Sequence, residues 1–324
     1  MNVGSFNIKV KEKAPIHGWN IDRIKKKLLG AGKTDGLLKK LITYALLLGI
    51  GFVYLYPLMF MIVNSLMDVS DLVNPTVRWV PTRMYFGNYR IAYKVLDASK
   101  TFGVSLVMAG LPALFQTACC AVVGYGFARF EFPLKRLWML LLVITFIIPG
   151  QVTMVPRYML FDAYGMINTP LPSMIPALLG QGIKSTIFVL VFYQFFHSYP
   201  KVLDEAGEID GAGKLKIFLK IALPMSVPAI VVAFLFSFVW YWNETYLAGI
   251  FFGKTIQTLP MRLQSFVDSY NRLYPTSDGS AVNRLNESIR MAGTMLTIVP
   301  MLLMYTVLQK QFVESVDRAG ITGE

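Results

Sequence analysis

A long apolar run from Leu41 to Val63 constrains this chain more than any other feature of its sequence. The run contains no charged residue, and a helix rising about 1.5 Å per residue would carry it across the roughly 30 Å of hydrocarbon in a bilayer. It begins too late, and is too long, for a cleavable signal peptide. We therefore expect a retained membrane span.

Further apolar runs predict an all-α, polytopic membrane helical bundle of about six transmembrane helices. They lie near 102–127, 137–160, 172–196, 228–252 and 291–311. Only 15% of the residues are charged, whereas soluble domains carry about 25%, so lipid is expected to surround much of the chain. With no internal repeat evident, the predicted division is an arm at 1–40, one transmembrane domain at 41–312 and a tail at 313–324.

The basic residues bear on topology. The formal net charge is +12, and ten of the 31 Lys and Arg residues precede residue 41. A basic arm at an anionic cytoplasmic leaflet explains that cluster, and no nucleic-acid-binding signature accompanies it. Six spans put both ends on one side, and most basic residues fall on that side. We predict a multi-pass protein of the cell inner membrane with cytoplasmic termini, membrane lipid as a partner and no nucleic acid.

Residues that carry covalent chemistry are sparse. Cys119 and Cys120 are adjacent within an apolar run and are expected to be small packing residues, while His17 and His197 are far apart in the sequence. The sequence therefore predicts no catalytic residue and no metal site, and the chain is not expected to be an enzyme.

A phosphate-binding loop is also excluded. Gly30–Thr34 contains Gly-Lys-Thr, but the motif needs a glycine where Lys27 stands and a preceding strand. The chain is therefore expected to hold no nucleotide or other cofactor of its own.

Pro and Gly recur inside the predicted spans, at Pro57, Pro112, Pro149, Gly150, Pro156, Pro176 and Pro300. Helix breaks leave backbone groups that lipid cannot satisfy, so these groups must face protein or water. A moving, water-accessible bundle is slightly favoured over the alternative that these residues are simply common in membrane helices.

The most informative segment is the predicted cytoplasmic loop at 200–228. Its first part has apolar residues at helical spacing, with acidic residues on other faces. The apolar positions are Val202, Leu203, Ala206, Ile209 and Ala212, and the acidic ones are Asp204, Glu205, Glu208 and Asp210. Gly211 and Gly213 permit a turn before a second short helix, which Pro224 and Pro228 are expected to end. The pattern predicts a helix pair under the membrane that docks on a partner.

This segment resembles the EAA loop of the permease subunits of binding-protein-dependent ABC importers. The matching residues are Glu205, Ala206, Asp210, Gly211, Ala212, Ile221, Leu223 and Pro224. Gly207 departs from the pattern, which has Ala there, and a Gly weakens a helix by about 1 kcal/mol. We expect Gly207 to soften the docking helix without abolishing it.

Other motifs extend the resemblance over nearly the whole chain and favour the sugar-importing branch typified by the maltose permease. They are Tyr56–Leu58, Asn64–Ser65, Gly124–Arg129, Trp242–Glu244, Gln311–Val313 and Ala319–Gly320. In this branch one permease has a tail that reaches the ATPase interface, and the similar residues here are Ala319, Gly320, Ile321, Thr322 and Gly323. The importer of the polyanion alginate is a candidate within the branch.

The resemblance implies a type I ABC importer permease fold. It further implies a second homologous permease, two ATPase subunits that bind ATP and Mg²⁺, and an extracytoplasmic solute-binding protein. Half of a pathway for an oligosaccharide, acidic or neutral, would be formed by this chain, with 205–223 acting as a lever for alternating access. The loops at 64–101 and 253–290 are expected to receive the binding protein.

Two other classes of protein were weighed. An ion-coupled secondary transporter is the main alternative, and it would need buried carboxylates or a cation site near the midplane. A membrane-embedded enzyme would need clustered His, Asp, Glu or Cys. Neither feature is evident in the sequence.

Four residues are candidates for the translocation pathway: Lys184, Trp240, Asn243 and Glu244. A charge within or near a span is costly, which makes Lys184 and Glu244 functional candidates. For Glu244 structural pairing is favoured, whereas for Lys184 a pathway role and a structural role are equally weighted. The aromatic residues at 240–242 and 246 point in several directions around a helix, so packing is favoured over stacking on sugar rings.

Overall fold

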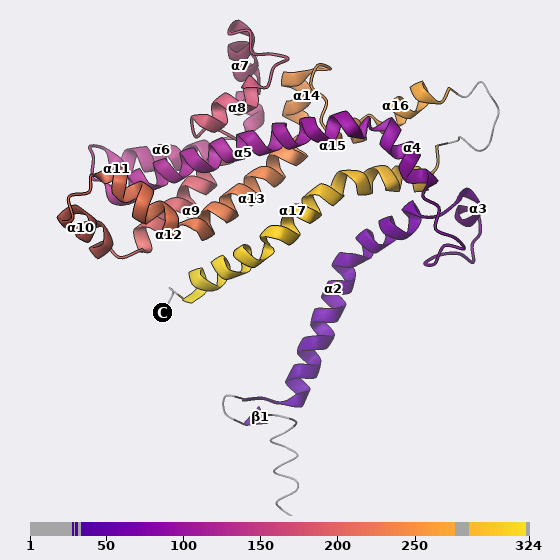
Figure 1. Cartoon of the computed structure of the whole chain (residues 1–324), viewed down its shortest axis with the longest axis horizontal. Helices are drawn as coiled ribbons and strands as arrows, with labels where there is room; N and C mark the ends of the chain where they lie inside the picture. The colour runs from indigo at the N-terminus through magenta and orange to yellow at the C-terminus, as the bar shows by residue number, and fades with distance from the viewer. Residues whose placement is uncertain (1–27, 29, 32–33, 276–284, 322–324) are drawn as a thin grey trace, which may run out of the picture. The chain divides into compact units, whose positions relative to one another are not determined.

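The computed structural model describes residues 28, 30–31, 34–275 and 285–321, and it is almost wholly helical (Figure 1). One short antiparallel hairpin joins β1 (Gly30–Ala31) and β2 (Thr34–Asp35). The helices, including one π-helical segment η1, are α2 (Leu37–Ser65), α3 (Val69–Leu72), α4 (Gly87–Val95), α5 (Ala98–Arg129), α6 (Lys135–Ile147), α7 (Gly150–Ala163), α8 (Leu171–Leu178), α9 (Ser185–Ser198), α10 (Val202–Ile209), α11 (Lys214–Ile217), η1 (Phe218–Ala222), α12 (Leu223–Met225), α13 (Val227–Asn243), α14 (Tyr246–Phe252), α15 (Leu259–Gln264), α16 (Phe266–Leu273) and α17 (Glu287–Ile321). This confirms the predicted all-α class.

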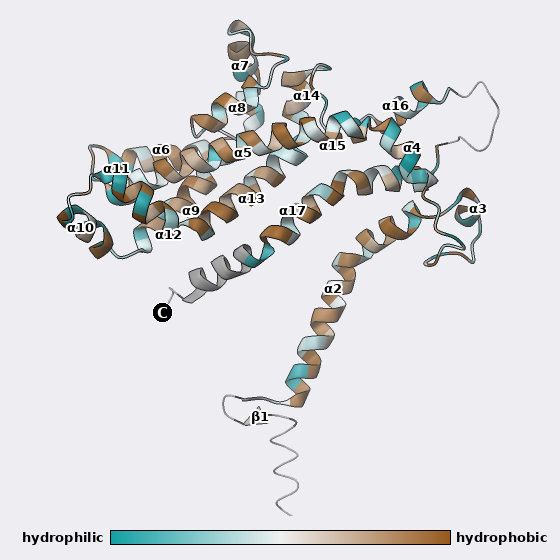
Figure 2. Cartoon of the chain, viewed as in Figure 1, coloured by the Kyte–Doolittle hydropathy of each residue, from teal (hydrophilic) through white to brown (hydrophobic). Residues whose placement is uncertain are grey.

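The chain forms two compact units, Met1–Phe60 and Met61–Glu324, with the boundary inside α2. The described part of the first unit contains the short hairpin and most of α2. This helix is apolar almost throughout (Figure 2), as expected of a segment surrounded by lipid. The predicted first span at 41–63 therefore lies within one continuous helix.

The second unit is built around α5. This helix packs along α8, α9 and α13, and meets α4 and α15 near its start. Its approach to α9 is close because Gly124 has no side chain: a Cβ there would lie 2.5 Å from the Cβ of Phe192 and 2.9 Å from the nitrogen of Tyr193. The missing side chain of Gly124, the first residue of the Gly124–Arg129 motif, thus allows the short distance between α5 and α9.

Aromatic and small side chains fill the space between these helices. Phe188, Phe192 and Phe196 of α9 are fully buried against the second half of α5 and the start of α13. Cys120 is fully buried in the same cluster, which confirms its predicted packing role, and Cys119 is half-buried. The end of the bundle formed by the second half of α5, α9 and the start of α13 therefore has a tightly packed aromatic core.

Three helices in the described part of the chain are long and apolar enough to cross a membrane unaided: α2, α5 and residues 287–310 of α17. Two bent pairs raise the number to five if each is one span. The first is α6 with α7, bent by 97°, and the second is residues 214–225 with α13, bent by 76°. The described residues thus contain three unbroken apolar helices of spanning length, or up to five with the bent pairs, where the sequence predicted about six spans.

The breaks have local causes. Ile148 is extended because it precedes Pro149, a position at which the helical conformation is disfavoured. The predicted span at 172–196 divides into α8 and α9, and the chain between them turns through left-handed conformations at Gly180 and Lys184. The 14-residue α9 is about 21 Å long, which is short of a bilayer's hydrocarbon thickness. The predicted span at 228–252 ends at Asn243 and resumes as α14.

Candidate functional site

The predicted docking loop at 200–228 is a pair of short helical segments, as its sequence pattern indicates. The first is α10, and the second runs without interruption through α11, η1 and α12. Pro224 was expected to end this segment, but the helix continues to Met225. The π-helical turn of η1 ends at Ala222, two residues before Pro224, and a proline removes one backbone donor from a helix.

Gly207 is the one fully buried residue of α10. A Cβ at this position would lie 3.1 Å from Cγ1 of Ile217 and 3.2 Å from Cδ1 of Ile221. The departure from Ala therefore has a packing reason, because α10 crosses the second segment at this glycine. The expectation that Gly207 merely softens the helix is incomplete.

Gly211 forms the turn after α10. Its φ of +78° is left-handed, a conformation that glycine adopts without steric cost. The amide of Gly211 donates to the carbonyl of Glu208 at 3.0 Å, and that of Ala212 donates to the carbonyl of Gly207 at 2.9 Å, as in a Schellman C-cap. Gly213 has a φ of −68°, so the turn depends on Gly211 alone.

Asp204 is turned toward the bundle rather than away from it, contrary to the prediction for the four acidic residues. Its Oδ2 lies 3.2 Å from Nε of Arg129, at the end of α5, and the two side chains are 16% and 5% exposed. Arg129 also donates from Nη2 to the carbonyl of Tyr199 at 2.8 Å, and its guanidinium lies 3.7 Å from the centre of that ring. We call Arg129, Asp204 and Tyr199 the α5–α10 tie.

The hydroxyl of Tyr199 completes the tie by donating a hydrogen bond to Oδ1 of Asp204. Burial, together with this hydrogen bond to Asp204, raises the pKa of Tyr199 well above its usual range. The phenol is therefore protonated, and remains a donor, at any physiological pH.

The opposite side of α10 carries exposed apolar residues, which we call the α10 outer face: Val202, Ala206, Ile209 and, beyond the turn, Leu215. Ile209 is 86% exposed and Leu215 is 71% exposed. Acidic side chains border this face, and one of them, Glu208, pairs with Lys214. In the part of the chain that the structure describes, nothing covers these apolar residues, as expected of a docking surface.

Two predicted pathway residues lie together. Lys184 has a left-handed backbone, with φ of 51°, at the start of α9, and its Nζ lies 4.7 Å from the centre of the Trp240 ring. Trp240 in turn packs on Phe188, with 5.1 Å between ring centres. Lys184 is exposed, so its charge is available while the indole is held by packing.

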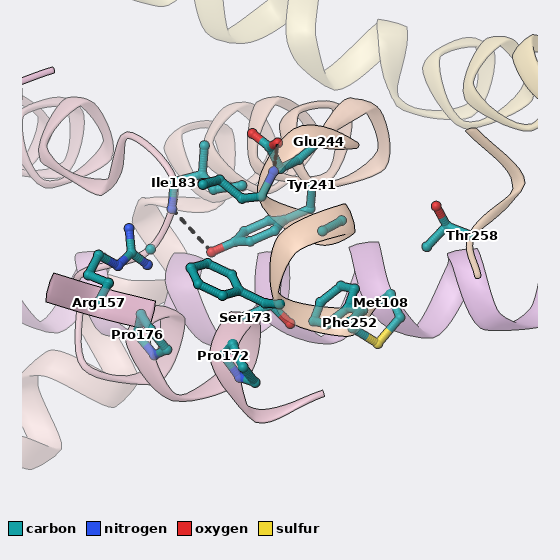
Figure 3. Close-up of a pocket in the computed structure, with 14 residues that line it drawn as sticks. Met108, Arg157, Pro172, Ser173, Pro176, Ile183, Tyr241, Glu244, Phe252 and Thr258 are labelled. Atoms are coloured by element: carbon teal, nitrogen blue, oxygen red, sulfur yellow. Dashed lines mark hydrogen bonds between the residues drawn. The ribbon is translucent and has the colours of Figure 1, made fainter. Parts of the chain in front are cut away.

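Asn243 and Glu244 instead shape the chain where α13 ends. Nδ2 of Asn243 donates to the carbonyl of Val239 at 2.9 Å, and Oε1 of Glu244 accepts from the amide of Leu247 at 2.9 Å. Glu244 also lines a cavity of about 50 Å³ together with Arg157, a cation that the sequence analysis did not single out (Figure 3). The hydrogen bond from the Leu247 amide agrees with the structural role that was favoured for Glu244.

The aromatic residues around Trp240 divide as expected. Tyr241 and Trp242 are buried, and Trp242 stacks on Phe238 with 5.6 Å between ring centres. Tyr246 is exposed. Packing, rather than an open surface for a sugar ring, therefore accounts for most of this cluster.

The family model described as "Binding-protein-dependent transport system inner membrane component" matches residues 121–318, from the end of α5 through the whole docking loop and into α17. The chain belongs to this family of permeases.

Individual relatives agree with this assignment. The permease is 31% identical to the osmoprotective compounds uptake permease protein GgtD of Synechocystis, over 70% of this chain and 77% of the relative. It is 25% identical to the polygalacturonan/rhamnogalacturonan transport system permease protein YtcP of Bacillus subtilis, over 87% and 98%.

A solved structure shares the fold. It is a chain from a bacterial ABC transporter involved in the import of the acidic polysaccharide alginate, with a TM-score of 0.69 and 18% identity. The match covers 87% of the permease and 100% of that chain. The helical breaks described above therefore occur within the fold of an ABC importer permease.

Membership defines the role of the permease in general terms. Family members are membrane-embedded, non-catalytic components of transport systems that work with a solute-binding protein and an ATPase. The permease is accordingly a transport subunit.

A buried polar cluster in the bundle was missed by sequence reasoning. Gln116 of α5 is fully buried, donates from Nε2 to the carbonyl of Ile183 at 2.9 Å, and accepts at Oε1 from the hydroxyl of Tyr241 at 2.8 Å. That hydroxyl accepts in turn from the amide of Ile183 at 3.2 Å (Figure 3). These bonds satisfy the backbone at the break before α9, as expected for irregular chain at membrane depth.

The two ends of the permease are only partly described. α17 extends to Ile321, so Ala319, Gly320 and Ile321 of the predicted tail continue the last helix, whereas Thr322 and Gly323 lie outside the described residues. Most of the predicted arm at 1–40 also lies outside them. The division at 40 and 313 stays a prediction.

Proposed function

We propose that this permease forms half of the translocation pathway of an ATP-driven oligosaccharide importer and alternates between inward-open and outward-open states. The other half is a second homologous permease. Two cytoplasmic ATPase subunits, which bind ATP and Mg²⁺, supply the energy, and an extracytoplasmic solute-binding protein delivers the sugar. In this arrangement both termini of the permease are cytoplasmic, in the inner membrane.

The observation that carries the proposal is the construction of α10. Its outer face exposes Ile209 and other apolar side chains for a partner, while the α5–α10 tie anchors its inner side to α5, the helix around which the second unit is built. Because one side of α10 is open to a partner and the other is held to α5 by an ion pair, a movement of the bound partner would move α10 and α5 together. The loop at 200–228 is therefore the proposed ATPase-coupling element, and the tail at 319–323 is a second proposed ATPase contact.

The substrate class is inferred from the relatives. One matched relative is named for the transport of polygalacturonan and rhamnogalacturonan, and the matched structure comes from a transporter that imports alginate, an acidic polysaccharide. Both are carbohydrate transporters, so the inferred substrate class is an oligosaccharide. The exposed charge of Lys184 beside Trp240 is compatible with an acidic sugar, because the indole offers a flat face and the ammonium a counter-charge.

The test is copurification of the ATPase with permease variants, followed by ATP-dependent uptake in vesicles. Ile209→Glu places a charge on the α10 outer face and is expected to reduce ATPase copurification at least tenfold. Val80→Glu, at an equally exposed apolar residue outside the docking loop, is the matched control and is expected to copurify normally.

Two results would contradict the proposal. Normal ATPase copurification with Ile209→Glu would show that α10 is not the docking element. Uptake that survives ATP depletion but stops when ion gradients are dissipated would identify an ion-coupled secondary transporter instead.

A further inference from the structure

A second, larger cavity lies beside the start of α5, far from the docking loop. Its volume is about 420 Å³, and its wall includes Asp97, Lys100, Thr101, Lys254 and Arg262. The pocket reaches along α5 as far as Met108, so about 30 Å of helix separates its near edge from Arg129 in the tie. We call it the basic pocket.

The basic pocket has an excess of positive charge that the described part of the chain does not neutralise. Lys100 and Lys254 are exposed, Arg262 is half-buried, and none of the three lies within ion-pairing distance of a described carboxylate. Asp97 is the one acidic residue in the wall. Three cations and one carboxylate leave a net positive site.

Arg262 is the half-buried cation of the wall. Its Nε is buried and has no hydrogen-bond partner among the described residues. A solute in the pocket would not reach that buried atom, so its contacts would be with the terminal nitrogens of the guanidinium. A guanidinium fork is complementary to a carboxylate, which it can bind through two parallel hydrogen bonds.

The size and depth of the pocket fit a sugar. Small-molecule sites typically measure about 300–1,000 Å³, which includes this cavity. Met108 of α5 lines both the basic pocket and the smaller cavity that holds Arg157 and Glu244. The two cavities therefore adjoin at the Met108 side chain.

We propose that the basic pocket binds the carboxylate of a uronic acid residue in the transported oligosaccharide, with Arg262 as its principal contact and Lys100 and Lys254 as supporting charges. This inference rests on the proposed function and narrows its substrate class to acidic sugars. Arg262 is a specificity-determining residue in this scheme.

The experiment compares two sugars in vesicles containing the full transporter and its binding protein. One is an oligouronate, and the other is its carboxyl-reduced counterpart of the same length and linkage. Arg262→Gln is expected to raise the concentration for half-maximal oligouronate uptake about tenfold and to leave uptake of the reduced sugar unchanged. Arg262→Lys should fall between, and Arg136→Gln, at an exposed cation on α6 outside the pocket, should match the unmodified permease.

The possible failures are distinguishable. If Arg262→Gln impaired the uptake of both sugars equally, Arg262 would be needed for folding or for contact with an acidic residue of the binding protein. That result would overturn the inference. ATP-dependent uptake of the reduced sugar with none of the oligouronate would also overturn it, while leaving the proposed importer function intact. ATP-independent uptake of both sugars would refute the proposed function itself.

Discussion

Removing the carboxylate of Asp204 should loosen α10 far more than removing any other acidic group on that helix. Arg129 is 5% exposed, and in Asp204→Ala its guanidinium would keep only the carbonyl of Tyr199 as an acceptor. The tyrosine hydroxyl would lose its acceptor as well. Breaking a buried ion pair from one side costs about 3–5 kcal/mol, and the 16% exposure of Asp204 favours the lower end of that range.

Hydrogen exchange of the α10 amides, measured on the permease in lipid nanodiscs, reports this loss directly. If these amides exchange through local opening of α10, a loss of about 3 kcal/mol accelerates exchange roughly 100-fold, since each 1.4 kcal/mol is a factor of ten. Asp204→Asn keeps an acceptor for Tyr199 and is expected to show a smaller effect.

Glu208→Ala provides a control on the same helix. The pair that Glu208 forms with Lys214 is exposed, at 45% and 60%, and exposed pairs contribute about 0–1 kcal/mol. Its loss should accelerate exchange by less than about fivefold. Similar rates for Asp204→Ala and Glu208→Ala would refute the idea that the tie anchors α10.

Three further predictions concern the docking loop and the pathway. Gly207→Ala should retain coupled uptake, because a gain of about 1 kcal/mol in helix propensity offsets the 3.1 Å contact with Ile217; loss of coupling would contradict this. Gly211→Pro should uncouple ATP hydrolysis from uptake, since proline cannot adopt a φ of +78°, and normal coupling would refute the lever. Lys184→Gln and Lys184→Ala should each lower transport of an oligouronate severalfold in vesicles, and unchanged transport would exclude Lys184 from the pathway.

Features that depend on neighbouring residues were predictable from sequence. Long apolar runs indicate membrane helices, and the Gly211 turn follows from a glycine placed between two amphipathic stretches. The break at Pro149 likewise has a local cause. The break before α9 was not predicted, because the backbone groups freed there are satisfied by Gln116 and Tyr241, which are distant in sequence.

The contacts of site residues that were missed share one property: they join residues that are distant in the sequence or that meet only when the chain folds back. Asp204 looked like a solvated acid because Arg129 is on another helix, and Gly207 looked like a defect because its contacts with Ile217 and Ile221 appear only when α10 folds back. Pairing Lys184 with Trp240 required the packing of α9 on α13. A helical periodicity identifies a face, but not what covers it.

The length of α5 has a thermodynamic consequence. One helix carries the basic pocket along its first three turns and the α5–α10 tie at its last, and its middle is fixed to α13 by Gln116. If this rod tilts as a unit, a solute that favours one tilt at the pocket end favours the same tilt at the tie. Linkage is reciprocal, so engagement of α10 must change the affinity of the pocket by the same factor by which the solute changes engagement.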